Sequence, residues 1–179
     1  MGLILLRHTT PAVEPGICYG QTDLGVAETF EKEATMVCDA LPPYTRIVKS
    51  PLVRCSELAH FIGKQASLAV ETEPRLIEMD FGTWEGRAWS DIPRAEIDAW
   101  AADFLHARPH GGESVAMLRA RTLAALKDWR EASKPTLIVT HAGVIKAALA
   151  TGKTAGDFDT KIDFGDFVTM SAEQGAPHE

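Results

Sequence analysis

Two short segments of the sequence place anion-binding arginines near a histidine or a helix start. Arg7 and His8 directly follow the apolar run Leu3–Leu6. A guanidinium beside an imidazole offers an anion clamp and a nucleophile. Arg54 ends the segment SPLVR, where free backbone N–H groups and the helix dipole would favour an anion. Each segment alone also fits a plainer interpretation, an exposed loop pair or a surface arginine.

A second histidine, His141, directly follows the apolar, β-branched run TLIVT. The Ala-Gly pair after it suits close approach of the backbone to phosphate oxygens. A histidine satisfied within the core is the ordinary alternative. We expect the remaining histidines to be structural or on the surface: His60, His106, His110 and His178.

A third segment, LIEMDFGTWEG, carries carboxylates on a glycine-rich loop. Glu78 precedes Gly82 and Gly86, which let backbone and an aromatic side chain approach a ligand. Glu78 is therefore a candidate proton donor, and Asp80 and Glu85 compete with it for that role.

Metal chemistry is not indicated by the sequence. The segment HARPH around Pro109 lacks both the helical His-x-x-x-His spacing and the nearby carboxylate that a zinc site requires. We therefore expect no metal and no other cofactor.

Alternating strands and helices must position these residues. The patterns predict an α/β sheet with right-handed crossovers and a ligand site at the carboxyl ends of its strands. The predicted strands are Leu3–Leu6, Arg46–Lys49, Leu68–Thr72, Thr136–Thr140 and Phe167–Met170. The predicted helices are Val26–Leu41, one capped by Ser50 with Pro51 first, Ser90–Ala107, one capped by Ser114, and Val144–Leu149.

The chain of 179 residues is expected to form one domain, 1–179. The less regular stretch at about 73–112 is expected to be a substrate-covering insertion. Its tryptophans, Trp84, Trp89 and Trp100, suit the wall of a small-molecule pocket. The tail 173–179 is predicted to be disordered.

Bulk composition limits the partners of this chain. The net charge of −7 argues against nucleic-acid binding, so an anionic ligand must be captured locally. The opening apolar run is too short for a signal or membrane segment. An odd number of cysteines without a C-x-x-C pair, Cys18, Cys38 and Cys55, favours the cytoplasm. The oligomeric state stays open between a monomer and a homodimer.

In order along the chain, RHT, SPLVRCSELA, E-x-x-F-G-x-W-E-G, GGES and VTHAGVI resemble the motifs of the histidine phosphatase superfamily. The resemblance spans roughly Leu3–Leu149 and implies a three-layer α/β/α fold with a central, mostly parallel sheet, as in phosphoglycerate mutase. It also implies roles for five positions. His8 matches the phosphorylated histidine, Arg7 and Arg54 the phosphate-binding arginines, His141 the second pocket histidine and Glu78 the acid/base carboxylate.

The sequence departs from the usual family pattern near the nucleophile. Thr9 replaces a glycine and Glu14 an asparagine, and GICYGQTDLGV, which replaces the usual G-R-x-Q-G-x-x-D-x-P-L, lies one residue nearer to His8 and lacks the proline. That segment resembles the branch that contains alpha-ribazole phosphatases of cobalamin assembly. The expected substrate contacts are Tyr19, Gln21, Thr22, Trp84 and Glu113.

The resemblance implies hydrolysis of a small phosphomonoester through a phosphohistidine intermediate. A phosphoglycerate mutase would use the same chemistry, but family mutases carry longer chains and more elaborate insertions. A protein phosphohistidine phosphatase is a further alternative, although those relatives have little covering insertion. A phospho-ligand binding module would leave the set of five polar residues unexplained.

Overall fold

A sheet of five strands forms the centre of the molecule. The computed structural model describes residues 2–131 and 134–171, so the tail 173–179 lies outside it. The spatial order is β3-β2-β4-β1-β5, with β5 antiparallel to β1 and the other neighbours parallel. The expected mostly parallel sheet is confirmed. The strands are β1 (Leu3–Arg7), β2 (Arg46–Lys49), β3 (Val70–Thr72), β4 (Thr136–Thr140) and β5 (Phe167–Met170).

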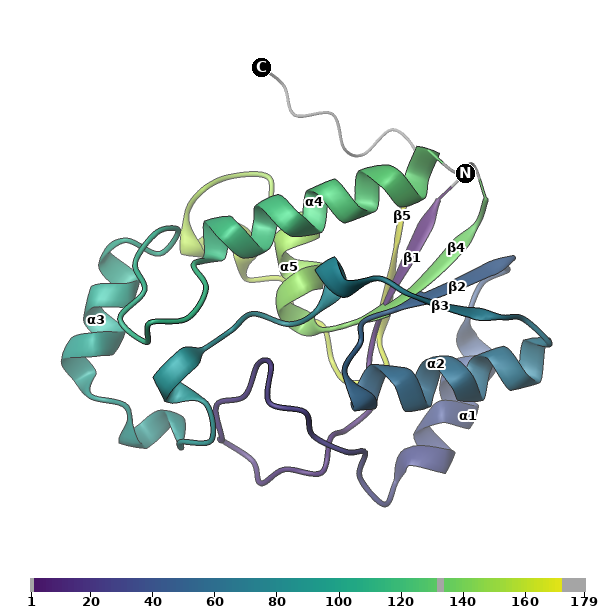
Figure 1. Cartoon of the computed structure of the whole chain (residues 1–179), viewed down its shortest axis with the longest axis horizontal. Helices are drawn as coiled ribbons and strands as arrows, with labels where there is room; N and C mark the ends of the chain where they lie inside the picture. Colours follow the sequence, from purple (N-terminus) through teal and green to yellow (C-terminus); the bar gives the residue numbers. More distant parts are fainter. Residues whose placement is uncertain (1, 132–133, 172–179) are drawn as a thin grey trace.

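Helices cover both faces of the sheet, as a three-layer fold requires (Figure 1). Successive side chains of β1 alternate between two cores, because neighbouring residues of a strand point to opposite faces. Ile4 and Leu6 pack with α1 (Phe30–Ala40) and α2 (Val53–Ala66). Leu3 and Leu5 pack with α4 (Val115–Glu131) and α5 (Ala142–Leu149).

The pairing of β1 with β4 brings the two predicted histidines together. The strands are parallel neighbours, and Arg7 stands opposite Thr140. His8 and His141 therefore leave the sheet at the same edge, and the backbone N–H of His8 donates to the carbonyl of Thr140 (3.0 Å).

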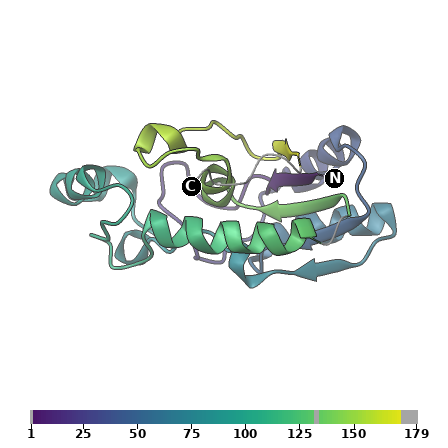
Figure 2. The ribbon, with the colours of Figure 1, turned by 90° about the horizontal axis from the view of Figure 1, so that it is seen from above.

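The segment between β3 and α4 extends beyond one end of the sheet. It contains three short 3-10 helices, Pro74–Leu76, Gly82–Trp84 and Trp89–Asp91, followed by α3 (Arg94–Ala102). Figures 1 and 2 both show α3 away from the strands. Two parts of this segment meet at Gly82. A glycine is required there, because φ is positive (49°) and a Cβ would lie 2.2 Å from the carbonyl oxygen of His110.

Two of the predicted helices are shorter in the structure. The helix expected over Val26–Leu41 begins at Phe30, because Val26 forms a β-bridge with Pro11 instead. The helix expected over Ser90–Ala107 spans only α3, because Pro93 disfavours helical geometry in the residue before it.

Two further element starts also differ from expectation. Ser50 does not cap α2, whose N-cap is Leu52; the Ser50 hydroxyl contacts His141 instead. The strand expected from Leu68 begins at Val70, because Ser67 in the left-handed region ends α2 and the N–H of Leu68 still bonds Gly63. The predicted cap by Ser114 is present, since its hydroxyl accepts from the N–H of Met117 (3.2 Å).

Candidate active site

His8 has the geometry of a neutral nucleophile. Its Nδ1 lies 2.7 Å from the carbonyl of Thr9, which can only accept, so the proton sits on Nδ1 and the lone pair on Nε2. Burial, reinforced by the charge of Arg54, lowers the pKa of His8 to about 3. The imidazole is therefore uncharged near neutral pH.

Arg54 sits directly against that lone pair. Its Nε donates to Nε2 of His8 at 3.3 Å, and its other two nitrogens donate to the carbonyls of Thr22 (2.9 Å) and Gly20 (2.7 Å). The guanidinium is fully buried and lies 5.3 Å from the ring centre of Tyr19. Backbone from another part of the chain thus fixes a cation beside the nucleophile.

Arg7 supplies a second cation in the same cavity as His8. Its Nη1 donates to the carbonyl of Ile162 (2.8 Å), and its guanidinium carbon stacks 3.8 Å from the ring centre of Phe164. Its buried Nε has no hydrogen-bond partner among the residues that the structure describes. A buried N–H without a partner is costly, so an anion that accepted from it would be favoured.

His141 lies behind the nucleophile. Its ring contacts that of His8 edge-on, with ring centres 5.2 Å apart, and its Nε2 is 2.7 Å from the hydroxyl of Ser50. Burial, followed by the charge of His8, lowers the pKa of His141 well below its usual value. The structure therefore pairs the two histidines but leaves His141 fully buried.

Glu78 faces the same pocket from the excursion after β3. One carboxylate oxygen accepts from the N–H of Met79 (2.8 Å) and the other from the N–H of Gly143 (3.0 Å) at the start of α5. Burial raises the pKa of Glu78 although these two hydrogen bonds oppose it. A raised pKa favours the protonated form that a proton donor needs.

The two competing carboxylates have structural partners instead. Glu85 accepts from the backbone N–H groups of Gln21, Thr22 and Phe81 and from the Thr22 hydroxyl. Asp80 accepts from the N–H of Gly82 (2.7 Å) and so closes a turn. Of these three carboxylates, Glu78 lines the two cavities described next, and Asp80 and Glu85 line neither of them.

Two adjoining cavities meet at Glu78. The polar cavity of about 490 Å³ contains Arg7, His8 and Tyr19, together with Lys161 and Ile162. The second, of about 560 Å³, is mainly apolar and is lined by side chains that include Met79, Phe81, Trp100, Phe104 and Phe158. Both cavities share Glu78, Trp89, Ala142, Lys146 and Asp159.

The five residues predicted to contact substrate lie in different places in the structure. Tyr19 lines the polar cavity. Trp84 does not fit the prediction, because its indole is fully buried with Cys18 and Ile92 and donates to Glu96 (2.6 Å). Trp89 takes the expected place at the cavities.

Gln21, Thr22 and Glu113 also have other partners than a ligand. Gln21 Nε2 donates to the carbonyl of Glu78 (3.1 Å), and the Thr22 carbonyl accepts from Arg54. Glu113 forms an ion pair with Arg121 at 2.7 Å. These three residues thus bond other parts of the protein, and their contact with a substrate stays a prediction.

The sequence did not single out Phe164, Lys146 or Arg121, and it marked Ser50 only as a helix cap. Ser50, Phe164 and Arg121 contact His141, Arg7 and Glu78, which lie far away along the chain, so no local pattern indicates these contacts. Lys146 lines both cavities. Within residues 2–131 and 134–171, no group of three or more histidine, cysteine or acidic side chains is arranged to hold a metal ion. No helix of that same part is long and apolar enough to cross a membrane.

Comparison with solved structures supports the same fold. A mycobacterial glucosyl-3-phosphoglycerate phosphatase superposes with a TM-score of 0.81 at 25% identity, covering 94% of this chain and 88% of that one. A phosphoglycerate mutase from Thermus thermophilus gives a TM-score of 0.78 at 27% identity, covering 97% and 94%.

Curated relatives carry two kinds of name. A "Probable phosphoglycerate mutase GpmB" of Photorhabdus laumondii is 33% identical over 68% of this chain and 60% of its own length. The adenosylcobalamin/alpha-ribazole phosphatase of Escherichia coli K12 is 32% identical over 58% of this chain and 56% of its own length. The chain thus spans about 60% of such relatives. Residues 3–166 match the family model of the histidine phosphatase superfamily (branch 1), and the chain belongs to that family.

Proposed function

We propose that this protein hydrolyses phosphomonoesters through a phosphohistidine formed on His8. The main observation is that Arg7, the neutral His8 imidazole and the Glu78 carboxyl, whose pKa is raised, line one cavity, while Arg54 donates to Nε2 of His8. Fixed donors of this kind stabilise charge that develops in a transition state.

In the first half-reaction, Nε2 of His8 attacks phosphorus and the ester P–O bond breaks. Arg7 and Arg54 hold the phosphoryl oxygens, His141 supports them, and Glu78 gives its proton to the leaving alkoxide. In the second half-reaction, the Glu78 carboxylate takes a proton from water. The resulting hydroxide attacks phosphorus, the P–N bond breaks, and phosphate leaves.

The substrate that we favour is a nucleoside-like 5′-phosphate such as alpha-ribazole 5′-phosphate, an intermediate of cobalamin assembly. Two observations support it: the relatives named alpha-ribazole phosphatases, and the apolar cavity beside Glu78 with Trp89 and Trp100 on its wall. Indole rings offer faces on which an aromatic base stacks.

A mutase activity is the second candidate, supported by the similarity to proteins named as phosphoglycerate mutases. It would use the same phosphohistidine but return the phosphoryl group to the product. The two candidates differ in a measurable product, inorganic phosphate. For location we favour the cytoplasm, where the free thiols of Cys18, Cys38 and Cys55 would remain reduced.

The first prediction is that His8→Ala abolishes both turnover of p-nitrophenyl phosphate and the trapped phosphoenzyme. Rapid quenching of the wild-type protein in alkaline detergent should preserve a phosphoryl adduct that is stable to base and lost on later exposure to acid, as expected of phosphohistidine. Its position is read by peptide mass spectrometry after mild digestion.

His60→Ala is the matched control, because His60 is an exposed histidine on α2 that bonds the carbonyl of Ser56. It should keep full turnover and full labelling. A phosphoenzyme of undiminished yield in His8→Ala would overturn the assignment. Binding of phosphate by the wild-type protein without any turnover would favour the binding module instead.

A further inference from the structure

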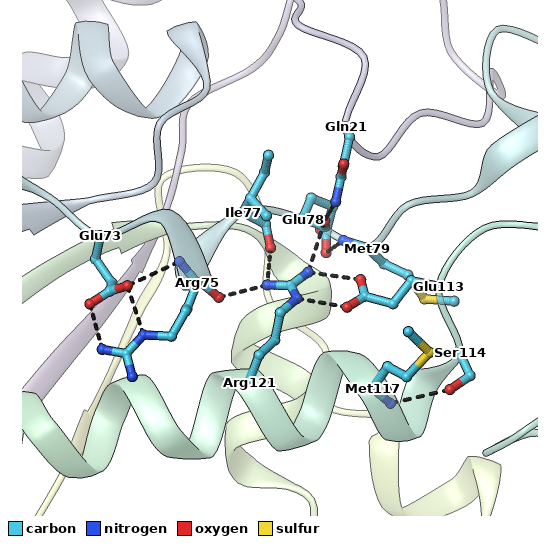
Figure 3. Close-up of polar contacts among 10 residues, drawn as sticks. All are labelled: Gln21, Glu73, Arg75, Ile77, Glu78, Met79, Glu113, Ser114, Met117 and Arg121. Atoms are coloured by element: carbon cyan, nitrogen blue, oxygen red, sulfur yellow. Dashed lines mark hydrogen bonds and ion pairs between the residues drawn. The ribbon is translucent and has the colours of Figure 1, made fainter.

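One arginine of the neighbouring helix makes several hydrogen bonds to the segment that carries Glu78. Arg121 lies on α4, and Figure 3 shows its guanidinium enclosed by backbone carbonyls and one carboxylate. Nη1 donates to the carbonyls of Arg75 and Ile77, each at 2.6 Å. Nη2 donates to the carbonyl of Glu78 at 3.0 Å.

Glu113 completes this arrangement from the chain just before α4. Its two carboxylate oxygens accept from Nε (2.7 Å) and Nη2 (2.9 Å) of Arg121. A guanidinium has five N–H donors in one plane. The five contacts therefore use the whole donor set of Arg121, and no other side chain type could make the same contacts.

The position of Glu78 has little tolerance for movement. Its carboxylate bridges the N–H of Met79 in its own segment and the N–H of Gly143 on α5. A Cβ on Gly143 would lie 2.3 Å from Oε1 of Glu78, so the carboxylate is packed against bare backbone. A shift of the Glu78 segment would break the bond to Gly143 and move the acid away from His8.

We propose that Arg121 and Glu113 are a positioning pair that fixes Glu78 for proton transfer. Neither side chain lines the two cavities, so the pair acts through the backbone of residues 75–78. This inference rests on the proposed role of Glu78 as the acid. Gln21 adds a second bond to the Glu78 carbonyl from the other side, which makes that carbonyl a shared anchor.

The test uses two substrates that differ in their need for an acid. Nitrophenolate leaves without protonation, whereas the alkoxide of glycerol phosphate requires it. The kcat/KM value reports the steps up to release of the alcohol, so the ratio of kcat/KM for the two substrates isolates acid catalysis. A merely structural role would lower both values and leave that ratio unchanged.

Arg121→Met should lower kcat/KM for glycerol phosphate by about 100-fold and for p-nitrophenyl phosphate by less than about threefold, since misplacement by about 1 Å can cost that much. Arg121→Lys keeps the charge but has fewer N–H donors. It should therefore lower kcat/KM for glycerol phosphate relative to p-nitrophenyl phosphate almost as much as Arg121→Met does. Glu113→Gln should give a smaller change in the same direction. It also serves as the test if neither Arg121 variant folds.

Arg46→Met is the matched control. Arg46 is another half-buried arginine that donates to a backbone carbonyl, that of Trp129, but it lies at the start of β2 near the opposite edge of the sheet. It should lower the melting temperature and leave the ratio at the wild-type value.

Glu78→Gln tests the acid role of Glu78 separately from the positioning role of Arg121 and Glu113. If Glu78→Gln changes the ratio and folded Arg121 and Glu113 variants do not, the positioning pair is wrong and the acid assignment stands. If Glu78→Gln leaves the ratio unchanged, the acid assignment fails and the pair fails with it. Equal losses on both substrates in the Arg121 variants would also overturn the positioning role.

Discussion

A histidine that attacks phosphorus must keep a lone pair free at the pH of the cell. At His8 the fold keeps the imidazole unprotonated by burial and by placing Arg54 against Nε2, both of which oppose protonation. The same features make protonation of His8 unfavourable in the folded state alone. Under the proposed mechanism, activity and acid stability are therefore linked through a single imidazole.

We predict that His8 makes the protein less stable as the pH falls below about 6.5, the usual value for an unfolded histidine. The folded pKa of His8 is about 3, so between these values the unfolded chain binds a proton that the folded chain does not. Stability is then present above the unfolded pKa and is lost as pH falls, by up to about 1.4 kcal/mol per pH unit.

Urea unfolding of wild type and His8→Gln near pH 7 and near pH 5 measures this effect. The wild-type protein should lose about 2 kcal/mol more than the variant over that range. His141, whose pKa is lowered chiefly by burial, is present in both proteins, so the comparison removes the burial part of its contribution. Parallel loss of stability in both proteins would contradict a depressed pKa at His8.

At the scale of elements, the sequence predicted the parts of the site that follow strands. His8 follows the apolar run Leu3–Leu6 and Arg7, His141 follows the β-branched run Thr136–Thr140, and parallel pairing of β1 with β4 brings both histidines to one edge. Trp84 and Ser50 show what could not be predicted. A tryptophan or serine has the same local pattern whether it meets a ligand or a distant buried side chain, so only the tertiary packing decides.

The loop that resembles the alpha-ribazole branch shows the same limit. Gln21 and Thr22 were expected to touch substrate, and no sequence pattern indicated that they also bond the Glu78 carbonyl and the Arg54 guanidinium. Arg121 gave no signal at all, because its partners Arg75, Ile77 and Glu78 lie more than forty positions away along the chain. Such through-space support is invisible to periodicity and motif spacing.

The segment before β5 adds a prediction at this scale. Phe164 stacks on the Arg7 guanidinium and its ring centre lies 5.6 Å from that of His8, although the residue is 37% exposed. Phe164→Ala should weaken inhibition by inorganic phosphate about two- to fivefold, since an exposed cation–π contact is worth roughly 0.5 to 1 kcal/mol. The inhibition constant of phosphate measures it.

Met36→Ala is the control for that experiment, because Met36 is an exposed apolar residue lining the same outer groove as Phe164. It should leave phosphate inhibition unchanged. If both variants weaken inhibition equally, the stack on Arg7 has no specific role.

Across the whole molecule, charge and shape are distributed unevenly. The chain carries a net charge of −7, yet the polar cavity contains Arg7, Lys146 and Lys161. Low-dielectric walls concentrate such a local positive field, so a phosphate can be captured by an acidic protein. Under the proposed function, the apolar cavity next to it would receive the group to which the phosphate is attached, and its wall would select among phosphomonoesters.

We therefore predict that the protein hydrolyses alpha-ribazole 5′-phosphate with a higher kcat/KM than 3-phosphoglycerate. An aromatic base can stack on Trp89 in the shared wall, whereas a three-carbon acid has no ring to stack. Stacking on an aromatic side chain is worth about 1 to 3 kcal/mol per base. Trp89→Ala should therefore reduce the preference by roughly one to two factors of ten.

Trp129→Phe serves as the control, because Trp129 bonds Glu73 and packs under Arg46 away from both cavities. Its preference should equal that of the wild type. Phosphate release must be assayed together with the appearance of 2-phosphoglycerate, because a mutase would interconvert the isomers without releasing phosphate. Preference of the wild type for 3-phosphoglycerate would refute the aromatic substrate while leaving the chemistry at His8 intact, since the two conclusions rest on different walls of the site.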